Sequence, residues 1–331
     1  HPWITFKDPS NARYRNQHEG TVHSSNLCTE ILLHTKPTRY VENSRKIKQY
    51  GETAVCNLGS INLKNHILYN GDGKATGVDY KKLKNTVSTG LRMLDNVIDI
   101  NFYPTEETKL SNMSHRPVGM GSMGWHDLYY NLDIIFDSEE ATKISSDIYE
   151  YISYNAIEAS SDLAKERGKY NTYEGSLWSQ DILPMDTYKT VMKTRDQRAL
   201  SRTRSDLDWN TLRAKIKKHG MRNSNTMAIA PTATISSIVG CSPSGEPYFS
   251  ALYVYSTLSG EFTMINEHFV NDMKALGKWN ESMVDDLKRT DGDVSQLTSV
   301  PDVIKSKYKT AFQQDQFKMI DQAAAKQRWI D

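Results

Sequence analysis

The chain is poor in cysteine, in net charge and in long apolar runs, and each shortage excludes a class of protein. Three cysteines in 331 residues, without paired spacing, exclude a secreted disulfide scaffold and indicate a reducing compartment. A net charge of +1 gives no general attraction to nucleic acid. No apolar run approaches the roughly 18 residues that span a bilayer. We expect a cytoplasmic protein (host-cell cytoplasm if it is viral) with neither a membrane nor nucleic acid as a partner.

Several recognisable signals are also missing from the sequence. The opening HPWITF is neither a signal peptide nor a transit sequence. The nine histidines have no HExxH pattern and no Cys/His spacing, which predicts that the chain has no metal site. There is no internal repeat, no low-complexity segment and no convincing linker. Together with 38% hydrophobic and 24% charged residues, this predicts a single globular domain over residues 1–331.

Short strand-like segments alternate with helical ones. β-Branched and apolar runs predict strands at residues 3–6, 54–63, 116–123, 226–230 and 248–255, and a polar tetrapeptide predicts a turn at 8–11. Helical spacing of apolar residues predicts helices at 78–98, 209–219 and 312–330. A capping box at Asp137 predicts a long helix that Gly168 ends. The alternation predicts an α/β fold with largely parallel strands.

A cysteine lies inside an Asn-x-Cys-x-Glu cluster. Asn26, Cys28 and Glu30 alternate, so in an extended segment their side chains would project to the same side. A carboxylate can take a proton from a hydroxyl, an amide can hold a second polar group, and a thiol can exchange electrons. A second cysteine, Cys56, follows in an apolar stretch. The pattern is suited to chemistry on a polyhydroxy substrate, although isolated cysteines more often serve as small buried hydrophobic residues.

Residues 119–124 match the dinucleotide fingerprint G-x-G-x-x-G, between a strand-like and a helix-like segment. Methionine at the variable positions suits burial rather than contact with a pyrophosphate. The acidic residue expected about 20 positions later falls in a predicted helix. Both interpretations stay open, and glycines that allow close strand packing are favoured.

The segment from Pro231 to Ser237 is rich in small and hydroxyl-bearing residues and follows a buried-looking strand. Its backbone N–H groups can bind an anion, which makes it a candidate phosphate site, although such turns often serve as simple caps. Cys241 has no base or metal ligand near it in the sequence and is predicted to be structural.

The segments SNLCTEI, AVCNLGSINL and MAIAPTATIS together resemble the signature segments of the large catalytic subunit of class I ribonucleotide reductases. They occur in the family's order, and the resemblance extends over nearly the whole chain. It implies the second half of a ten-stranded α/β barrel with a central finger loop. The finger loop would span about residues 12–35, the half-barrel about 50–260 and a helical part about 261–331. In that family the RPxGxGxxG segment is a barrel strand.

The resemblance also implies roles for individual residues. Cys28 would carry a thiyl radical, Glu30 would accept the proton of the ribose 3′-hydroxyl, Asn26 would hold the intermediate, and Cys56 would be half of a reducing dithiol. The substrate would in addition be bound by Ser25, Thr232, Ala233, Thr234, Ile235 and Ser236. The diphosphate would be held by the five residues from Thr232 to Ser236.

The same resemblance implies partners. The chain itself would bind no cofactor, because the radical comes from a metal-containing small subunit and the electrons from a dithiol protein of the thioredoxin or glutaredoxin type. The substrate would be a ribonucleoside diphosphate. The second cysteine of the dithiol would come from an N-terminal segment, and the radical-transfer tyrosines and a Cys-x-x-Cys tail from a C-terminal one. We expect activity only in that assembly, whether the protein is naturally split or trimmed.

Two other functions fit less well. Adenosylcobalamin-dependent reductases share the barrel and the cysteine chemistry, but the NLCTEI form differs from a Pro-Cys-Gly type of finger loop. A non-catalytic module derived from a reductase would have no reason to keep Asn26, Cys28, Glu30 and Cys56 together.

Overall fold

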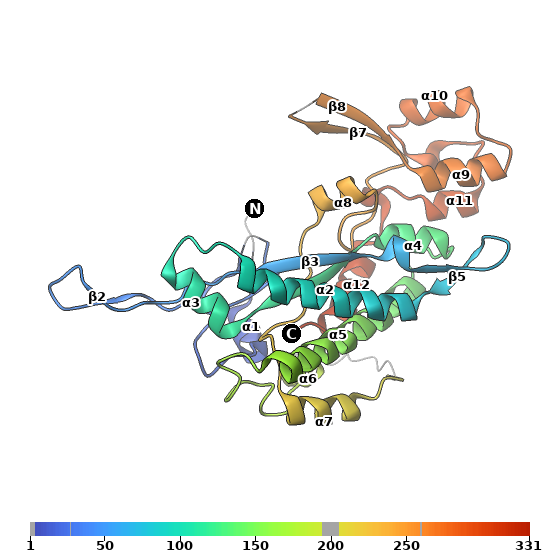
Figure 1. The fold of residues 1–331 in the computed structure, drawn as a ribbon. Coiled ribbons are helices and arrows are strands. Elements are labelled where there is room, and N and C mark those ends of the chain that lie inside the picture. Colours follow the sequence, from blue (N-terminus) through green and yellow to red (C-terminus); the bar gives the residue numbers. More distant parts are fainter. Residues whose placement is uncertain (1–3, 27, 194–204, 259) are drawn as a thin grey trace.

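A parallel pair of strands, β3 (Asn57–Asn62) and β6 (Val118–Met123), lies at the centre of the molecule (Figure 1). The structure is a computed structural model that describes residues 4–26, 28–193, 205–258 and 260–331. The pair is in register from Asn57 opposite Val118 to Asn62 opposite Met123. Residues 225–230 run alongside β6, where the Met120 N–H donates to the Thr226 carbonyl (2.9 Å) and Met227 bridges Met120 in parallel. Every residue of β6 is buried.

Two long helices cover this layer. They are α2 (Tyr80–Ile100) and α5 (Glu139–Arg167), which pack on each other. Of the predicted apolar stripe of α2, Leu83, Val87, Leu91 and Ile98 are buried and Leu94 is partly buried. Helix α5 ends before Gly168 as predicted, but its N-cap is Ser138, whose hydroxyl accepts from the Ala141 N–H. The predicted Asp137 cap is therefore wrong by one residue. The Asp137 carboxylate instead pairs with Lys309 at 2.7 Å.

The remaining elements are short. The other helices are α1 (Lys7–Arg13), α3 (Glu106–His115), α4 (Trp125–Asn131), α6 (Pro184–Met192), α7 (Trp209–His219), α8 (Ala233–Val239), α9 (Glu267–Ala275), α10 (Glu281–Arg289), α11 (Asp302–Lys307) and α12 (Gln316–Gln327), with 3₁₀ turns η1 (Leu63–His66), η3 (Val294–Gln296) and η4 (Ala311–Gln313). The other strands are β1 (Arg39–Tyr40), β2 (Ile47–Gln49), β4 (Ile67–Tyr69), β5 (Ala75–Val78), β7 (Leu252–Thr257) and β8 (Gly260–Ile265). None of the described helices is both long and apolar enough to cross a membrane.

The α/β class is confirmed, but the prediction of largely parallel strands is wrong. Within the described residues the pairs β1–β2, β4–β5 and β7–β8 are antiparallel, and the strands form two-stranded sheets without closing a barrel. Short connections make antiparallel pairing the natural outcome in each hairpin. The hairpins β1–β2 and β7–β8 extend away from the body (Figure 1).

Two further predictions at the N-terminal end fail. The turn at 8–11 lies inside helix α1, because Pro9 falls in the first helical turn, where a missing N–H costs nothing. Residues 4–6 of the predicted strand are irregular, and Trp3 lies outside the described residues. Helix 209–219 is confirmed residue for residue. The strand at 248–255 begins only at Leu252, and helix 312–330 spans Gln316–Gln327.

The predicted helical C-terminal part divides between two cores. Helices α9 and α10 and the segment up to Tyr308 have an apolar cluster of their own, which Tyr130 of α4 joins. Helix α12 instead packs on α5 in the main core, and the Ser153 hydroxyl donates to the Trp329 carbonyl at 2.7 Å. Sequence order is therefore not the order of packing.

Candidate functional site

The Cys28 segment is an irregular loop closed by its own hydrogen bonds. The Glu30 carboxylate accepts from the Cys28 backbone N–H at 2.7 Å through one oxygen and from the Asn26 amide at 3.0 Å through the other. The chain reverses at Thr29, whose φ is +61°. The predicted extended alternation is therefore wrong, yet the turn brings the same three residues together. Residues 14–26 and 28–35 form no helix or strand, whereas residues 12 and 13 of the predicted finger loop lie in α1.

The base of this loop is closed by Ile31. Its carbonyl accepts from the Ser25 hydroxyl at 3.2 Å and, at 3.5 Å, from the Asn26 N–H. The Ile31 side chain is buried, whereas Asn26 is exposed and Cys28 is partly exposed. The loop thus anchors an apolar residue in the body and leaves the thiol and the amide accessible.

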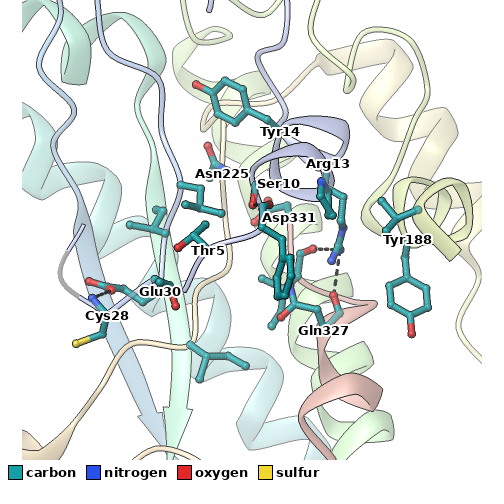
Figure 2. Close-up of a pocket in the computed structure, with 18 of the residues that line it drawn as sticks. Thr5, Ser10, Arg13, Tyr14, Cys28, Glu30, Tyr188, Asn225, Gln327 and Asp331 are labelled. Carbon is teal, nitrogen blue, oxygen red and sulfur yellow. Dashed lines mark hydrogen bonds between the residues drawn. The ribbon is translucent and has the colours of Figure 1, made fainter. Parts of the chain in front are cut away.

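A pocket of about 490 Å³ lies beside the loop (Figure 2). Cys28 and Glu30 line one side of it, and Arg13 and Tyr188 lie on the opposite side (Figure 2). The Arg13 guanidinium donates to the carbonyls of Gln327 (3.0 Å) and Ile330 (2.5 Å). Burial lowers the pKa of Arg13 to about 10, so it remains cationic at neutral pH. The pocket thus joins a thiol, a carboxylate and a guanidinium.

The wall between these sides is built on the extended segment beside β6. The Asp331 carboxylate accepts from the backbone N–H groups of Thr226 (2.8 Å) and Met227 (2.9 Å). Asn225 and Ile229 from the same segment line the pocket. Arg13 and Asn225 did not stand out in the sequence, because neither belongs to a local motif.

Cys56 lies one residue before β3, and it is not among the described residues that line this pocket. Burial, with the nearby Glu30 charge as a second cause, raises the pKa of the Cys56 thiol to about 12. Glu30 is therefore electrostatically coupled to both cysteine-bearing segments. At neutral pH Cys56 is a protonated thiol, which suits a donor of hydrogen and electrons rather than an ionic nucleophile.

The predicted phosphate segment is a helix start rather than an open turn. Thr232 precedes α8 and is buried, with its hydroxyl accepting from the Ser244 N–H at 2.7 Å. Ser236 is also buried, and its N–H donates to the Thr232 carbonyl at 2.8 Å. The three residues between them are exposed: Ala233, Thr234 and Ile235. Of the predicted site residues, Cys28 and Glu30 line the pocket, whereas residues 232–236 of the predicted phosphate segment do not.

The glycine-rich segment is explained by packing. A Cβ on Gly119 would lie 2.7 Å from the Ala228 Cβ, and one on Gly121 would lie 2.4 Å from the Ala228 carbonyl oxygen. The glycines are needed where β6 meets residues 225–230, which supports close packing over dinucleotide binding. Cys241 is buried and unpaired, and burial raises the pKa of its thiol to about 11, in keeping with a structural residue.

One polar cluster was missed by the sequence. His34, Glu52 and His115 converge, with their ligand atoms within 4.8 Å of one another. They are separated by 18 and 63 residues, so no motif spacing links them.

The comparisons with known proteins agree on one family. The family model described as the barrel domain of ribonucleotide reductase matches residues 1–331. The chain is 48% identical to the ribonucleoside-diphosphate reductase subunit alpha of Chlamydia trachomatis, over 100% of this chain and 30% of that protein. It is 38% identical to the ribonucleoside-diphosphate reductase large chain 2 of Saccharomyces cerevisiae, over 100% of this chain and 35% of that protein. It is 37% identical to the ribonucleoside-diphosphate reductase large subunit of Arabidopsis thaliana, over 100% of this chain and 39% of that protein. The chain thus spans about a third of the length of these curated relatives.

Proposed function

The chain belongs to the ribonucleotide reductase family through its barrel domain, and on that premise we propose that it is the catalytic segment of a ribonucleoside-diphosphate reductase large subunit. The substrate would be a ribonucleoside diphosphate with its ribose at Cys28, Asn26 and Glu30. Ser25 supports this loop at the ribose, and the diphosphate is held at Thr232–Ser236. The names of the relatives support the reductase activity and speak against the two other functions considered.

The observation that carries the proposal is the bonding of Glu30. Its two carboxylate oxygens accept from the Cys28 N–H and the Asn26 amide, which fixes the carboxylate beside the thiol. Each oxygen keeps a free acceptor position for a substrate hydroxyl. A base that takes the 3′-hydroxyl proton while the neighbouring sulfur takes the 3′ hydrogen atom needs this arrangement.

The proposed reaction replaces a C2′–OH bond with a C2′–H bond. The Cys28 thiyl removes the hydrogen atom from C3′, Glu30 accepts the 3′-hydroxyl proton, and the 2′-hydroxyl leaves as water. Two thiols supply two electrons and two protons and become a disulfide. The C3′ hydrogen is returned from Cys28, and the proton held by Glu30 returns to the 3′ oxygen. The raised pKa of Cys56 supports its place as one of these thiols, because a protonated thiol carries both the electron and the proton.

The rest of the assembly follows from this proposal. We propose that β3, β6 and residues 225–230 belong to the second half of the ten-stranded barrel, and that an N-terminal segment supplies the other half and the partner of Cys56. A C-terminal segment supplies the tyrosines and the Cys-x-x-Cys tail. The small subunit supplies the radical, and a thioredoxin- or glutaredoxin-type protein supplies the electrons in a reducing cytoplasm. The pocket beside Cys28 is where the substrate enters.

The test is Cys28→Ser in the longest natural polypeptide that contains this chain, assayed with its small subunit. A hydroxyl cannot replace a thiyl radical, so deoxyribonucleotide formation should fall to background while the far-UV circular dichroism stays unchanged. Cys241→Ser is the matched control and should keep most of the activity, because Cys241 is buried away from the pocket lining. Wild-type turnover by Cys28→Ser would overturn the proposal.

A further inference from the structure

Two imidazoles and a carboxylate meet outside the lining of the pocket. His34 Nε2 lies 3.0 Å and His115 Nε2 lies 2.6 Å from the same oxygen of Glu52, Oε2. Both histidines are almost fully buried, and the two rings meet edge to face with centroids 4.8 Å apart. Among the histidine, cysteine, aspartate and glutamate side chains of the described residues, these three form a group whose possible metal-ligand atoms all lie within 4.8 Å of one another.

The outer nitrogen of each histidine faces a hydroxyl. His34 Nδ1 lies 2.5 Å from the Tyr14 hydroxyl, and His115 Nδ1 lies 2.7 Å from the Thr172 hydroxyl. A metal-bound imidazole needs such an acceptor for its other N–H, because this contact fixes the ring and its tautomer. The hydroxyls therefore allow each histidine to carry its proton on Nδ1 and to turn Nε2 toward a cation.

The charges around the cluster admit a dication. The Lys36 ammonium lies 2.9 Å from the other Glu52 oxygen, Oε1, and 2.7 Å from Glu19, so it leaves Oε2 to the histidines. With neutral histidines, the two carboxylates outweigh the one ammonium by a single negative charge.

We propose that His34, Glu52 and His115 form a binding site for one divalent cation of the zinc class. Two imidazole nitrogens and one carboxylate oxygen are a donor set that zinc accepts, with a fourth position left for water. Bond lengths of about 2.0–2.2 Å require the three ligand atoms, now within 4.8 Å of one another, to rearrange around the cation. The site is separate from the pocket lining and from the radical chemistry proposed for Cys28.

The site would join three segments that meet at the cysteines. His34 follows the Cys28 loop, Glu52 precedes Cys56, and His115 ends α3 just before β6. The backbones of Lys36 and Glu52 are already paired, by N–H to carbonyl bonds of 2.9 and 2.8 Å in the two directions. A cation here would add a link from α3 to that pair and hold the two cysteine-bearing segments at a fixed separation.

The first experiment measures binding of zinc alone. The longest natural polypeptide containing this chain is stripped with a chelator, kept reduced, and titrated with Zn²⁺ against a chromogenic chelator. We expect one equivalent per chain that Glu52→Gln and His115→Gln lose and His66→Gln keeps. His66 is the matched control, because it is buried with both ring nitrogens bonded to uncharged oxygens, of Asn62 and Thr86. Equal zinc content in the wild type and Glu52→Gln would overturn the site.

Two milder variants keep the test decisive if Glu52→Gln does not fold. Tyr14→Phe removes the hydroxyl that would accept the Nδ1–H of a metal-bound His34 and should weaken zinc binding about 10- to 100-fold. Lys36→Met removes a cation beside the metal and should tighten binding. If the cluster is only a hydrogen-bonded ion network, Lys36→Met will leave zinc binding absent or weaker, and the proposal fails.

Cobalt provides an independent readout of the ligands. Co²⁺ added to the stripped protein should give visible ligand-field bands without the near-ultraviolet charge-transfer band of a thiolate ligand, since the donors are nitrogen and oxygen. The bands should be missing in His115→Gln. A thiolate band that persists in His115→Gln and disappears with a cysteine substitution would assign the metal to cysteines and overturn the site.

Discussion

The two cysteine-bearing segments are held by different kinds of structure. Cys28 lies in an irregular loop whose shape depends on one carboxylate, that of Glu30, and on a residue with positive φ, Thr29. Cys56 leads directly into β3, which is paired with the fully buried β6 over six residues. Side chain to backbone contacts in a partly exposed loop resist displacement less than a buried sheet does.

The difference indicates a division of tasks. A residue that must approach a substrate and then withdraw suits a loop, whereas a residue that must meet one fixed partner suits a rigid strand. Glu30 is the group that spans both, because it bonds to the Cys28 N–H and its charge acts on Cys56. The following predictions test the contrast between an adjustable and a fixed cysteine.

The largest effect is expected from Cys56→Ser. The variant should permit at most a single turnover in the full assembly, because no intramolecular disulfide can form, while the fold stays intact. Product per active site in a rapid-quench assay measures this, and mass spectrometry of the oxidised wild type should find Cys56 bonded to a cysteine outside this chain. A stable Cys28–Cys56 or Cys56–Cys241 bridge would show that the pairing is wrong.

The strand side of the contrast predicts that Gly121→Ala destabilises the protein by about 1–3 kcal/mol. The new methyl group would lie 2.4 Å from the Ala228 backbone oxygen, and backbone cannot move aside cheaply. Denaturant unfolding measures the change. Gly71→Ala is the control, since nothing lies within 4 Å of its Cβ position, and it should change stability by less than about 0.5 kcal/mol. Equal effects of the two would refute the packing role of Gly121.

The link between the segments is tested by Glu30→Gln. Removing the negative charge should lower the pKa of the Cys56 thiol, so that alkylation of Cys56 at alkaline pH becomes several-fold faster. Mass spectrometry of iodoacetamide labelling against pH follows the rate, with Cys241 as an internal reference. The burial of Cys56 is the larger cause of its raised pKa, and the shift should therefore be partial. An unchanged Cys56 profile would mean that the two segments are electrostatically independent.

The smallest effect is expected at Thr29. A non-glycine residue at φ +61° costs about 1–2 kcal/mol, so Thr29→Gly should stabilise the chain by up to about 1 kcal/mol after the entropy of glycine is deducted. Asn43→Gly at φ +55° is the control with a smaller gain, because asparagine tolerates this conformation. Thermal unfolding measures both. A marked loss of stability in Thr29→Gly would show that the exposed threonine makes contacts that fix the loop.

How far the sequence predicts the fold depends on the range of the interactions. Helix α2 follows from a local apolar period, whereas α1 was missed because its polar, proline-containing sequence gives no such period. Residue types identified the Cys28 cluster, but the turn at Thr29 replaced the predicted strand geometry. Arg13 in the pocket and His115 in the polar cluster depend on contacts between residues far apart in the chain, which no local pattern reports.

The placement of α12 has a consequence for how the molecule opens. This helix packs on α5 in the main core, although α9 and α10, which precede it in the sequence, build a separate cluster with Phe269 and Leu287. Residues from about 250 to 308 are therefore flanked on both sides by segments that pack in the main core. A unit flanked in this way can unfold locally while both of its ends stay anchored. The conformational entropy that it gains is therefore that of a closed loop and not of a free tail.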